Sequence, residues 1–257
     1  MTEPMILYSN VLASGVTATN TAAGDYSVDY LYDLRPYTYW RAASFGTRYI
    51  TMDAGAAVAV DSLAIYKHNL GTAAATVSLE SSATGAWAGE QTERVAGFVP
   101  TTDFVIFKTF AQVSVRYWRI KIVTDAIAPE MAVAMIGAAM DFPVFPDSPF
   151  TPLSESVNAT AETSKGGHLL GVTSYYSPIS VDVGFTWPPM SFVDGDFKTF
   201  WDNHGRRLKP FFWVPNFSQW AGKIYFVRFP DNFTLAVPQS DTTNADTLRL
   251  KFQGVAE

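Results

Sequence analysis

The sequence contains no cysteine in 257 residues. Disulfide bonds, thiolate catalysis and cysteine-ligated zinc are therefore excluded, and the fold must be held by packing alone. Histidine is almost as rare, with three residues at positions 68, 168 and 204. None has the spacing of a catalytic triad or a metal pair, and no phosphate-binding loop or hydrolase motif occurs. We therefore expect no catalytic residue, no metal and no cofactor, and we predict that the chain is not an enzyme.

Charged residues are also scarce, at 16% of the chain, against about 25% in an average soluble domain. The formal net charge is −6, and no block of basic residues occurs. A sequence-independent grip on phosphate backbones needs such a block, so nucleic acid is not an expected partner. Aromatic residues, by contrast, make up 15% of the chain. Few charges and many aromatic rings together indicate surface that is buried against other subunits.

Long apolar runs are missing as well. The best candidate, residues 131–140, contains Gly137 and lies between Pro129 and Pro143. It is half the length that a membrane-spanning helix needs, about 20 residues, so it is predicted to be a buried strand. The first ten residues lack the basic and apolar regions of a signal peptide. We expect no membrane insertion and a protein that folds in a cytosol.

Short alternating segments dominate the first half of the chain. In residues 113–123, Trp118, Ile120 and Ile122 share one face, while polar and charged residues share the other. Such alternation predicts a sheet with one face in water. No helical period longer than two turns precedes residue 190. The first half is therefore predicted to be all-β.

Prolines punctuate the middle of the chain. They stand at every third position from 143 to 152, which favours an extended polyproline II segment that acts as a stiff spacer. The sequence thus predicts a first domain at 1–141, a proline-rich linker at 142–153 and a second domain at 154–257.

One short helix is predicted in the second domain, at about 195–204. Phe197, Phe200 and Trp201 lie at i, i+3 and i+4, so their rings share one helical face. His204 lies at the C-terminal end, where a cation is favourable. The residues able to cap the two ends are Asp194 or Asp196 and Gly205.

Aromatic residues crowd between positions 185 and 233, where they account for 15 of 49 residues. This exceeds what a domain of about 100 residues needs for its core, and aromatic rings concentrate at the centres of protein interfaces. Trp213, Phe217 and Trp220 are the candidate subunit-interface residues. The alternative is that these rings close the core of the second domain itself.

A sugar-binding surface is a second hypothesis. Sugar recognition uses an exposed aromatic ring with hydrogen-bonding groups beside it, and residues 26–41 are rich in tyrosine and arginine. The candidate carbohydrate-binding residues are Tyr37, Tyr39, Arg41, His68 and Asn69. The alternative is that the large rings of this region, Trp40 above all, fill the core. The aspartates of the region, Asp25, Asp29 and Asp33, lack a spacing that specifies a calcium site.

The short helix, followed by His204-Gly-Arg206 and then Pro210-Phe-Phe212, resembles the C-terminal segment of small tail-tip and distal-tail proteins of long-tailed bacteriophages. The resemblance covers roughly residues 150–257. It implies a small β-barrel with one flanking helix, copies of the chain arranged in a ring, and contacts with the neighbouring tail-tube and hub proteins. It also implies a place in the virion tail, after assembly in the cytoplasm of the host bacterium.

Five segments in the first half, in this order, resemble discoidin-like, galactose-binding-like jelly rolls. They are Leu12–Thr19, Tyr32–Arg41, Tyr49–Gly55, Val60–Tyr66 and Arg116–Ile122. The resemblance covers about residues 6–141 and implies an eight-stranded sandwich. The chain departs from the family at Asp53-Ala-Gly55 and at Asp33-Leu-Arg-Pro36, and the second departure falls in a loop that the family often uses for ligands.

The sequence therefore predicts an all-β protein: an N-terminal galactose-binding-like jelly-roll β-sandwich, then a small C-terminal β-barrel or sandwich with one flanking α-helix. The function it favours is that of a structural component of a bacteriophage tail tip or baseplate, with the jelly roll projecting outward. The alternative is a carbohydrate-binding adhesin or binding module that contacts a glycan on the host surface.

Overall fold

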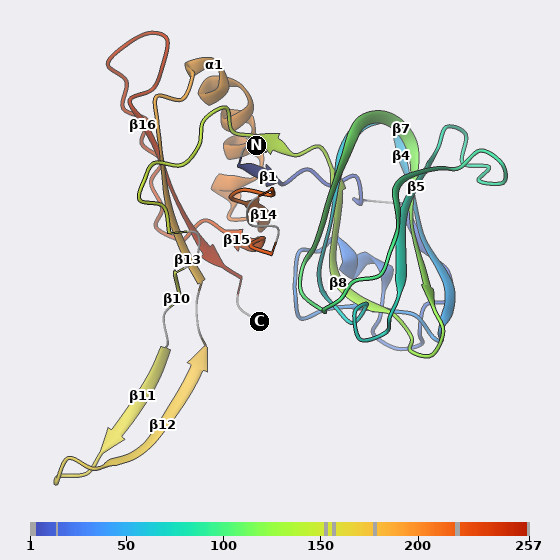
Figure 1. Cartoon of the computed structure of the whole chain (residues 1–257), viewed down its shortest axis with the longest axis horizontal. Helices are drawn as coiled ribbons and strands as arrows, with labels where there is room; N and C mark the ends of the chain where they lie inside the picture. Colours follow the sequence, from blue (N-terminus) through green and yellow to red (C-terminus); the bar gives the residue numbers. More distant parts are fainter. Residues whose placement is uncertain are drawn as a thin grey trace. The chain divides into compact units, whose positions relative to one another are not determined.

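A computed structural model describes residues 4–13, 15–151, 154–155, 158–176, 179–218 and 222–255. The chain forms two compact units (Figure 1). The N-terminal unit is Ile6–Met140, and the C-terminal unit combines Met1–Met5 with Asp141–Glu257. Both are built on antiparallel strands, so the prediction of an all-β chain with one helical segment is confirmed.

The N-terminal unit is a β-sandwich with a short 3₁₀ turn, η1 (Val28–Leu31). Its strands are β2 (Val16–Ala18), β3 (Trp40–Arg41), β4 (Gly46–His68), β5 (Thr76–Ser82), β6 (Thr92–Phe98), β7 (Ile106–Thr124) and β8 (Glu130–Gly137). The hydrogen-bonded order is β3-β8-β4-β7-β5-β6, and β2 pairs with β4.

Strands β4 and β7 are long enough to run through both layers of the sandwich. Their pairing shifts register between Asp53 and Val58 and again between Val60 and Ser62, and such bulges bend a strand pair. Before the first shift β4 also pairs with β2, and after the second it pairs with β8. Figure 1 shows the two strands curving over together. Because β4 and β7 bend, a single series of hydrogen-bonded strands forms both layers of the sandwich.

The core of the N-terminal unit follows the predicted alternation. Trp118, Ile120 and Ile122 are fully buried, and Trp40 is buried among them. The wet face predicted for residues 113–123 carries the intervening polar side chains, which are partly exposed.

The C-terminal unit contains a seven-stranded sheet in the order β10-β13-β16-β15-β14-β1-β9. The strands are β1 (Met5–Leu7), β9 (Met140–Asp141), β10 (Ser154–Glu155), β13 (Ile179–Thr186), β14 (Phe211–Val214), β15 (Tyr225–Arg228) and β16 (Thr247–Gly254). A separate hairpin pairs β11 (Asn158–Thr163) with β12 (Leu169–Tyr176).

The first strand of the chain belongs to this sheet, which the sequence did not predict. β1 lies between β14 and β9, so the segments that enter and leave the N-terminal unit are neighbours. The amide N–H of Phe142 donates to the carbonyl oxygen of Pro4 at 2.8 Å.

The helical segment begins five residues earlier than predicted. It comprises α1 (Met190–Phe192), the π-helical turn η2 (Val193–Phe197) and α2 (Lys198–Asn203), followed by the 3₁₀ turn η3 (Gly205–Arg207). Pro189 stands at the N-cap, and no side chain caps that end, so neither predicted aspartate cap is used. The left-handed residue is Leu208, with φ 55°, and not Gly205. Gly205 is needed for space, because a Cβ there would lie 2.9 Å from the rings of Phe229 and Trp201.

The aromatic face of the helix packs as predicted. Phe197 and Phe200 are buried, and the ring of Phe200 lies 5.1 Å from that of Phe211 on β14. Trp201 is half-buried, with its ring centroid 5.1 Å from that of Phe229. Many of the crowded aromatic residues thus form the core between helix and sheet.

The proline-rich segment is not a free spacer. Phe142 is fully buried, and its ring stacks on that of Phe185 with centroids 4.6 Å apart. Farther on, the amide of Asp147 donates to the carbonyl oxygen of Gly184 at 2.8 Å. The described part of this segment is therefore attached to the C-terminal unit through core packing and edge hydrogen bonds. Among the described residues, no helix combines the length and the apolar character needed to cross a membrane.

Candidate functional site

Two exposed tyrosines precede strand β3, and an arginine ends this strand, at the edge of the N-terminal unit. Tyr37 is 66% exposed and Tyr39 is 37% exposed. Between Tyr39 and Arg41, Trp40 is fully buried, and its Nε1 donates to Oγ1 of Thr21 at 3.0 Å. Because neighbouring residues of a strand point to opposite faces, the burial of Trp40 turns Arg41 outward.

Arg41 faces an acidic partner on the adjacent strand. Its register partner on β8 is Glu130, and Nε of Arg41 lies 3.9 Å from Oε2 of Glu130. Both side chains remain accessible, at 47% and 40% exposed. The guanidinium also lies over the ring of Tyr26, 5.9 Å from its centroid. We call this group, Tyr26, Tyr37, Tyr39, Arg41 and Glu130, the β3 surface.

Asn69 adjoins the β3 surface but is engaged by the backbone. Its Nδ2 donates to the carbonyl oxygen of Ala128 at 2.9 Å, and its Oδ1 accepts from the amide of Glu130 at 2.9 Å. The structure thus brings the predicted residues Arg41 and Asn69 together through Glu130. Asn69 holds the start of β8 in place, which differs from the predicted ligand contact.

His68 is not available to a ligand. Its side chain is fully buried, and Nδ1 accepts from the amide of Leu70 at 3.2 Å. Burial lowers the pKa of His68, while Asp103, 4.0 Å from Nδ1, acts in the opposite direction. The predicted sugar-binding role of His68 is therefore replaced by a structural role in the turn after β4.

The acidic loop before β3 is held by its own hydrogen bonds. The hydroxyl of Tyr30 donates to Asp25, and that of Tyr32 donates to Asp29. These bonds raise the pKa of both tyrosines. Asp33 accepts from a backbone amide and a threonine hydroxyl, each at 2.8 Å. In the described part of the chain, no three acidic or histidine side chains gather as a metal site would require.

A second cluster, which the sequence did not reveal, covers the outer face of β4, β7 and β5. The guanidinium carbon of Arg119 lies 4.4 Å from the ring centroid of Tyr49 and 4.2 Å from that of Trp87. Arg119 also pairs with Glu80, whose side chain is 6% exposed and which lies 3.7 Å from Nζ of Lys121. Trp87 belongs to the turn after β5, where no alternation signals its position. The stack fixes this turn over the sheet.

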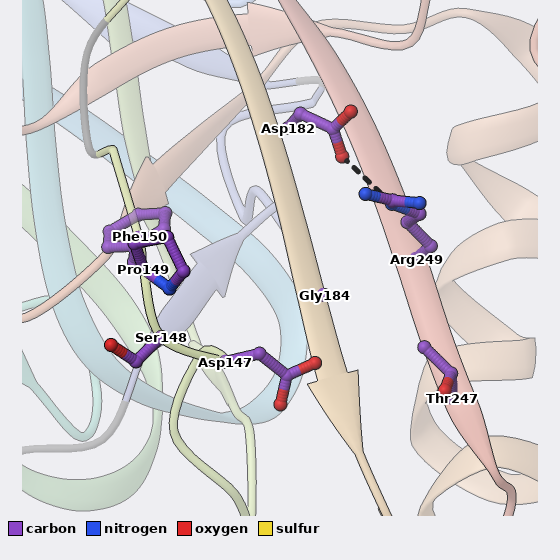
Figure 2. Close-up of a pocket in the computed structure, with 8 residues that line it drawn as sticks. All are labelled: Asp147, Ser148, Pro149, Phe150, Asp182, Gly184, Thr247 and Arg249. Atoms are coloured by element: carbon purple, nitrogen blue, oxygen red, sulfur yellow. Dashed lines mark hydrogen bonds and ion pairs between the residues drawn. The ribbon is translucent and has the colours of Figure 1, made fainter.

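A cavity of about 510 Å³ lies beside β13 in the C-terminal unit (Figure 2). Figure 2 shows Asp182 and Arg249 on neighbouring strands, with Nε of Arg249 3.4 Å from the carboxylate. On the other side, Asp147 accepts from the amide and the hydroxyl of Thr186, both at 3.0 Å. Asp182 thus links β13 to β16, and Asp147 links the proline-rich segment to β13. These contacts favour a structural role for the two carboxylates.

Comparison with known proteins gives no family. No protein-family model and no curated protein match the chain. Solved structures that resemble about half of the chain include carbohydrate-binding modules and a Ruminococcus gnavus GH29 fucosidase. Chitosan-binding module 1 of a Paenibacillus sp. IK-5 chitosanase/glucanase aligns at 14% identity and a TM-score of 0.43, over 51% of this chain and all of the module. The CBM32 of AlyQ, in complex with 4,5-unsaturated mannuronic acid, aligns at 21% identity and a TM-score of 0.41, over 51% of this chain and 96% of its own. The Clostridium perfringens module CpGH89CBM32-5, in complex with GalNAc-β-1,3-galactose, aligns at 13% identity and a TM-score of 0.40, over 48% and 94%.

The predicted subunit-interface residues lie in different environments. Trp213 is fully buried, with its ring 5.7 Å from that of Phe142 and 5.3 Å from that of Phe252. It is part of the core of its own unit and is not available to another subunit, as the alternative interpretation held. Phe217 is half-buried, and Trp220 lies outside the described residues.

Proposed function

We propose that the chain is a non-catalytic binding protein whose N-terminal unit binds carbohydrate through the β3 surface. The observation that carries this proposal is the exposure of Tyr37 and Tyr39, which shortly precede Arg41 in the sequence, together with the accessible Arg41–Glu130 pair. Sugars present apolar C–H faces and rows of hydroxyl groups. Exposed rings next to charged hydrogen-bonding groups match both features.

The geometry of the ion pair supports this role. At 3.9 Å, Arg41 and Glu130 attract each other but do not form a hydrogen bond. Guanidinium N–H groups and carboxylate oxygens are thus left for hydroxyl groups, which both donate and accept. The ring of Tyr26 supports the guanidinium, and Asn69 holds the backbone of Glu130. The surface is therefore anchored before a ligand arrives.

The absence of catalysis is part of the same proposal. His68 and His204 are buried, and the carboxylates of the loop before β3 accept hydrogen bonds from neighbouring groups. A general acid or base needs a group that can reach the substrate. Because these side chains are buried or already hydrogen-bonded, they favour ligand binding over catalysis as the function.

We expect Tyr39→Ala and Arg41→Ala each to weaken glycan binding at least tenfold, or about 1.4 kcal/mol. Both side chains are exposed, so the fold should be unchanged. Titration calorimetry with chitosan oligosaccharides, unsaturated mannuronate and GalNAc-β-1,3-galactose, the ligands named for the similar structures, measures this after a glycan array has extended the panel. Trp87→Ala, in the Arg119 stack of the same unit, should bind like the parent. The proposal is refuted if no glycan binds, or if Trp87→Ala loses binding while Tyr39→Ala keeps it.

A second candidate is a structural role in the tail tip or baseplate of a bacteriophage virion, as the C-terminal resemblance implies. The observation that favours it is the hairpin β11–β12, where Leu169 and Leu170 are 63% and 68% exposed. An assembly of copies with tail-tube and hub proteins would cover such a surface. We expect mass spectrometry to detect the chain in purified virions of a phage that encodes it, and immunogold labelling to mark the tail end. Virions that contain the other tail proteins but lack this chain would contradict the role.

A further inference from the structure

The hairpin β11–β12 forms a two-stranded sheet that is separate from the seven-stranded sheet of its unit. Its two strands pair with each other and, in the described part of the chain, with no other strand (Figure 1). Nearly every described side chain from 159 to 173 is exposed. An isolated two-stranded hairpin is at best marginally stable in water, so this one gains stability if something covers it.

One face of the hairpin is suited to being covered. Ala161 pairs with Val172, and the adjacent pair, Thr160 and Thr173, points to the opposite face. Val172 is 58% exposed, and toward the tip the strand continues with two exposed leucines. We call Ala161, Leu169, Leu170 and Val172 the hairpin patch. The opposite face is polar, so the hairpin has one apolar side and one wet side.

The same unit carries a groove of about 600 Å³ between the helical segment and residues 233–239, with both apolar and polar side chains in its lining. We call it the helix groove, and its apolar part is lined by Met190, Val193, Phe197, Trp201, Phe233 and Leu235. Trp201 and Phe233 form its aromatic wall, with ring centroids 5.8 Å apart. The groove has room for several aliphatic side chains.

Each of the two surfaces carries one charge that is unpaired within the part of the chain that the structure describes, and the two are of opposite sign, while Lys198 and Asp202 in the groove lining pair with each other. Lys165 lies at the tip of the hairpin, and Asp194 lies among the groove residues and is exposed. Neither has an ion-pair partner among the described residues. Seating the hairpin patch in the helix groove can bring the two charges together at the rim.

We propose that the hairpin patch of one copy docks into the helix groove of a second copy of this chain. The two surfaces differ, so the contact is heterologous, and each copy offers one hairpin and one groove. Repetition of such a contact builds a ring or a filament, depending on the rotation between copies. This association is independent of sugar binding at the β3 surface.

The test is light scattering coupled to size-exclusion chromatography, on the full chain and four lysine variants. We expect the parent to associate in a concentration-dependent way, and Val172→Lys and Leu235→Lys each to weaken association at least tenfold. The matched controls change the neighbouring residue on the other side, Thr173→Lys and Ala236→Lys, and should associate like the parent. Circular dichroism of all five proteins shows whether they are equally folded.

A mixing experiment decides which surfaces meet. Val172→Lys retains a normal groove and Leu235→Lys retains a normal hairpin, so an equimolar mixture should form a one-to-one dimer and nothing larger. A parent chain that is monomeric at roughly 100 μM, well above a micromolar Kd, overturns the proposal. It is equally overturned if Leu235→Lys associates normally while Val172→Lys does not, because hairpins would then pair with hairpins.

Discussion

Replacing Phe142 with alanine is expected to destabilise the C-terminal unit by about 3–5 kcal/mol, the usual cost of removing a fully buried phenylalanine. The ring of Phe142 touches aromatic neighbours on several sides. It stacks on Phe185, lies 5.2 Å from the ring of Phe192 and meets Trp213 edge-on. No single neighbour can move in to fill the space, so a cavity should remain. Differential scanning calorimetry measures the change in the melting transition of this unit.

Phe145→Ala is the matched control for this experiment. It removes the same ring three residues later in the same proline-rich segment, but Phe145 is 44% exposed. Its effect should stay within about 0.5 kcal/mol. A Phe142→Ala protein that melts like the parent would show that the segment is not part of the core.

Acidification from about pH 6.5 to about pH 4 is expected to remove up to about 3 kcal/mol from the stability of the C-terminal unit through His204 alone. Burial lowers the pKa of His204 to about 4, although Nε2 lies 2.8 Å from the carbonyl oxygen of Pro210, which acts in the opposite direction. In an unfolded chain a histidine has a pKa of about 6.5. Between these values the unfolded chain binds a proton that the folded chain does not, so the free energy of unfolding falls as the pH falls.

The contribution of His204 should be complete above pH 6.5 and should not change further below pH 4. His204→Gln keeps a donor for the carbonyl of Pro210 but cannot titrate, so its stability should depend less steeply on pH in this window. His168→Gln serves as the control, because His168 is exposed in the hairpin turn. Denaturant unfolding at several pH values compares the slopes. Equal slopes for the parent and His204→Gln would contradict the role of burial.

The sequence predicted those parts of the fold that depend on local periodicity. The alternation of Trp118, Ile120 and Ile122 identified the core face of β7, and the spacing of Phe197 and Phe200 identified the buried face of the helix. The start of the helix was missed because the π-helical turn Val193–Phe197 interrupts the regular helical period.

Long-range packing was beyond the reach of such patterns. Proline spacing suggested a spacer for residues 142–153, yet the burial of Phe142 depends on Phe185 and Trp213, which are far away in sequence. The sequence placed His204 at the C-terminal end of a helix, where the protonated form of histidine is favoured. Burial of the side chain has the larger effect and lowers its pKa instead.

Of the candidate site, the sequence identified the exposed residues that precede or belong to β3, and it missed the residues whose positions depend on the tertiary fold. The loop character of residues 26–41 pointed to Tyr37, Tyr39 and Arg41, and all three side chains are exposed in the structure. Glu130 was missed because it meets Arg41 through the pairing of β3 with β8, two strands that are far apart in the sequence. The burial of His68 could not be predicted either, since it follows from the tertiary fold around β4 and β8.

The position of β1 between β14 and β9 has a consequence for synthesis on the ribosome. At about 5–20 residues per second, β14 emerges roughly 10–40 s after β1. During this interval the first strand of the C-terminal sheet has no β14 to pair with, and the whole N-terminal unit is synthesised before β14 appears. That unit can fold first and hold its two ends together, because β1 and β9 flank it and meet at Pro4 and Phe142. The nascent chain would then carry a preformed two-strand seed onto which the later strands of the sheet are added.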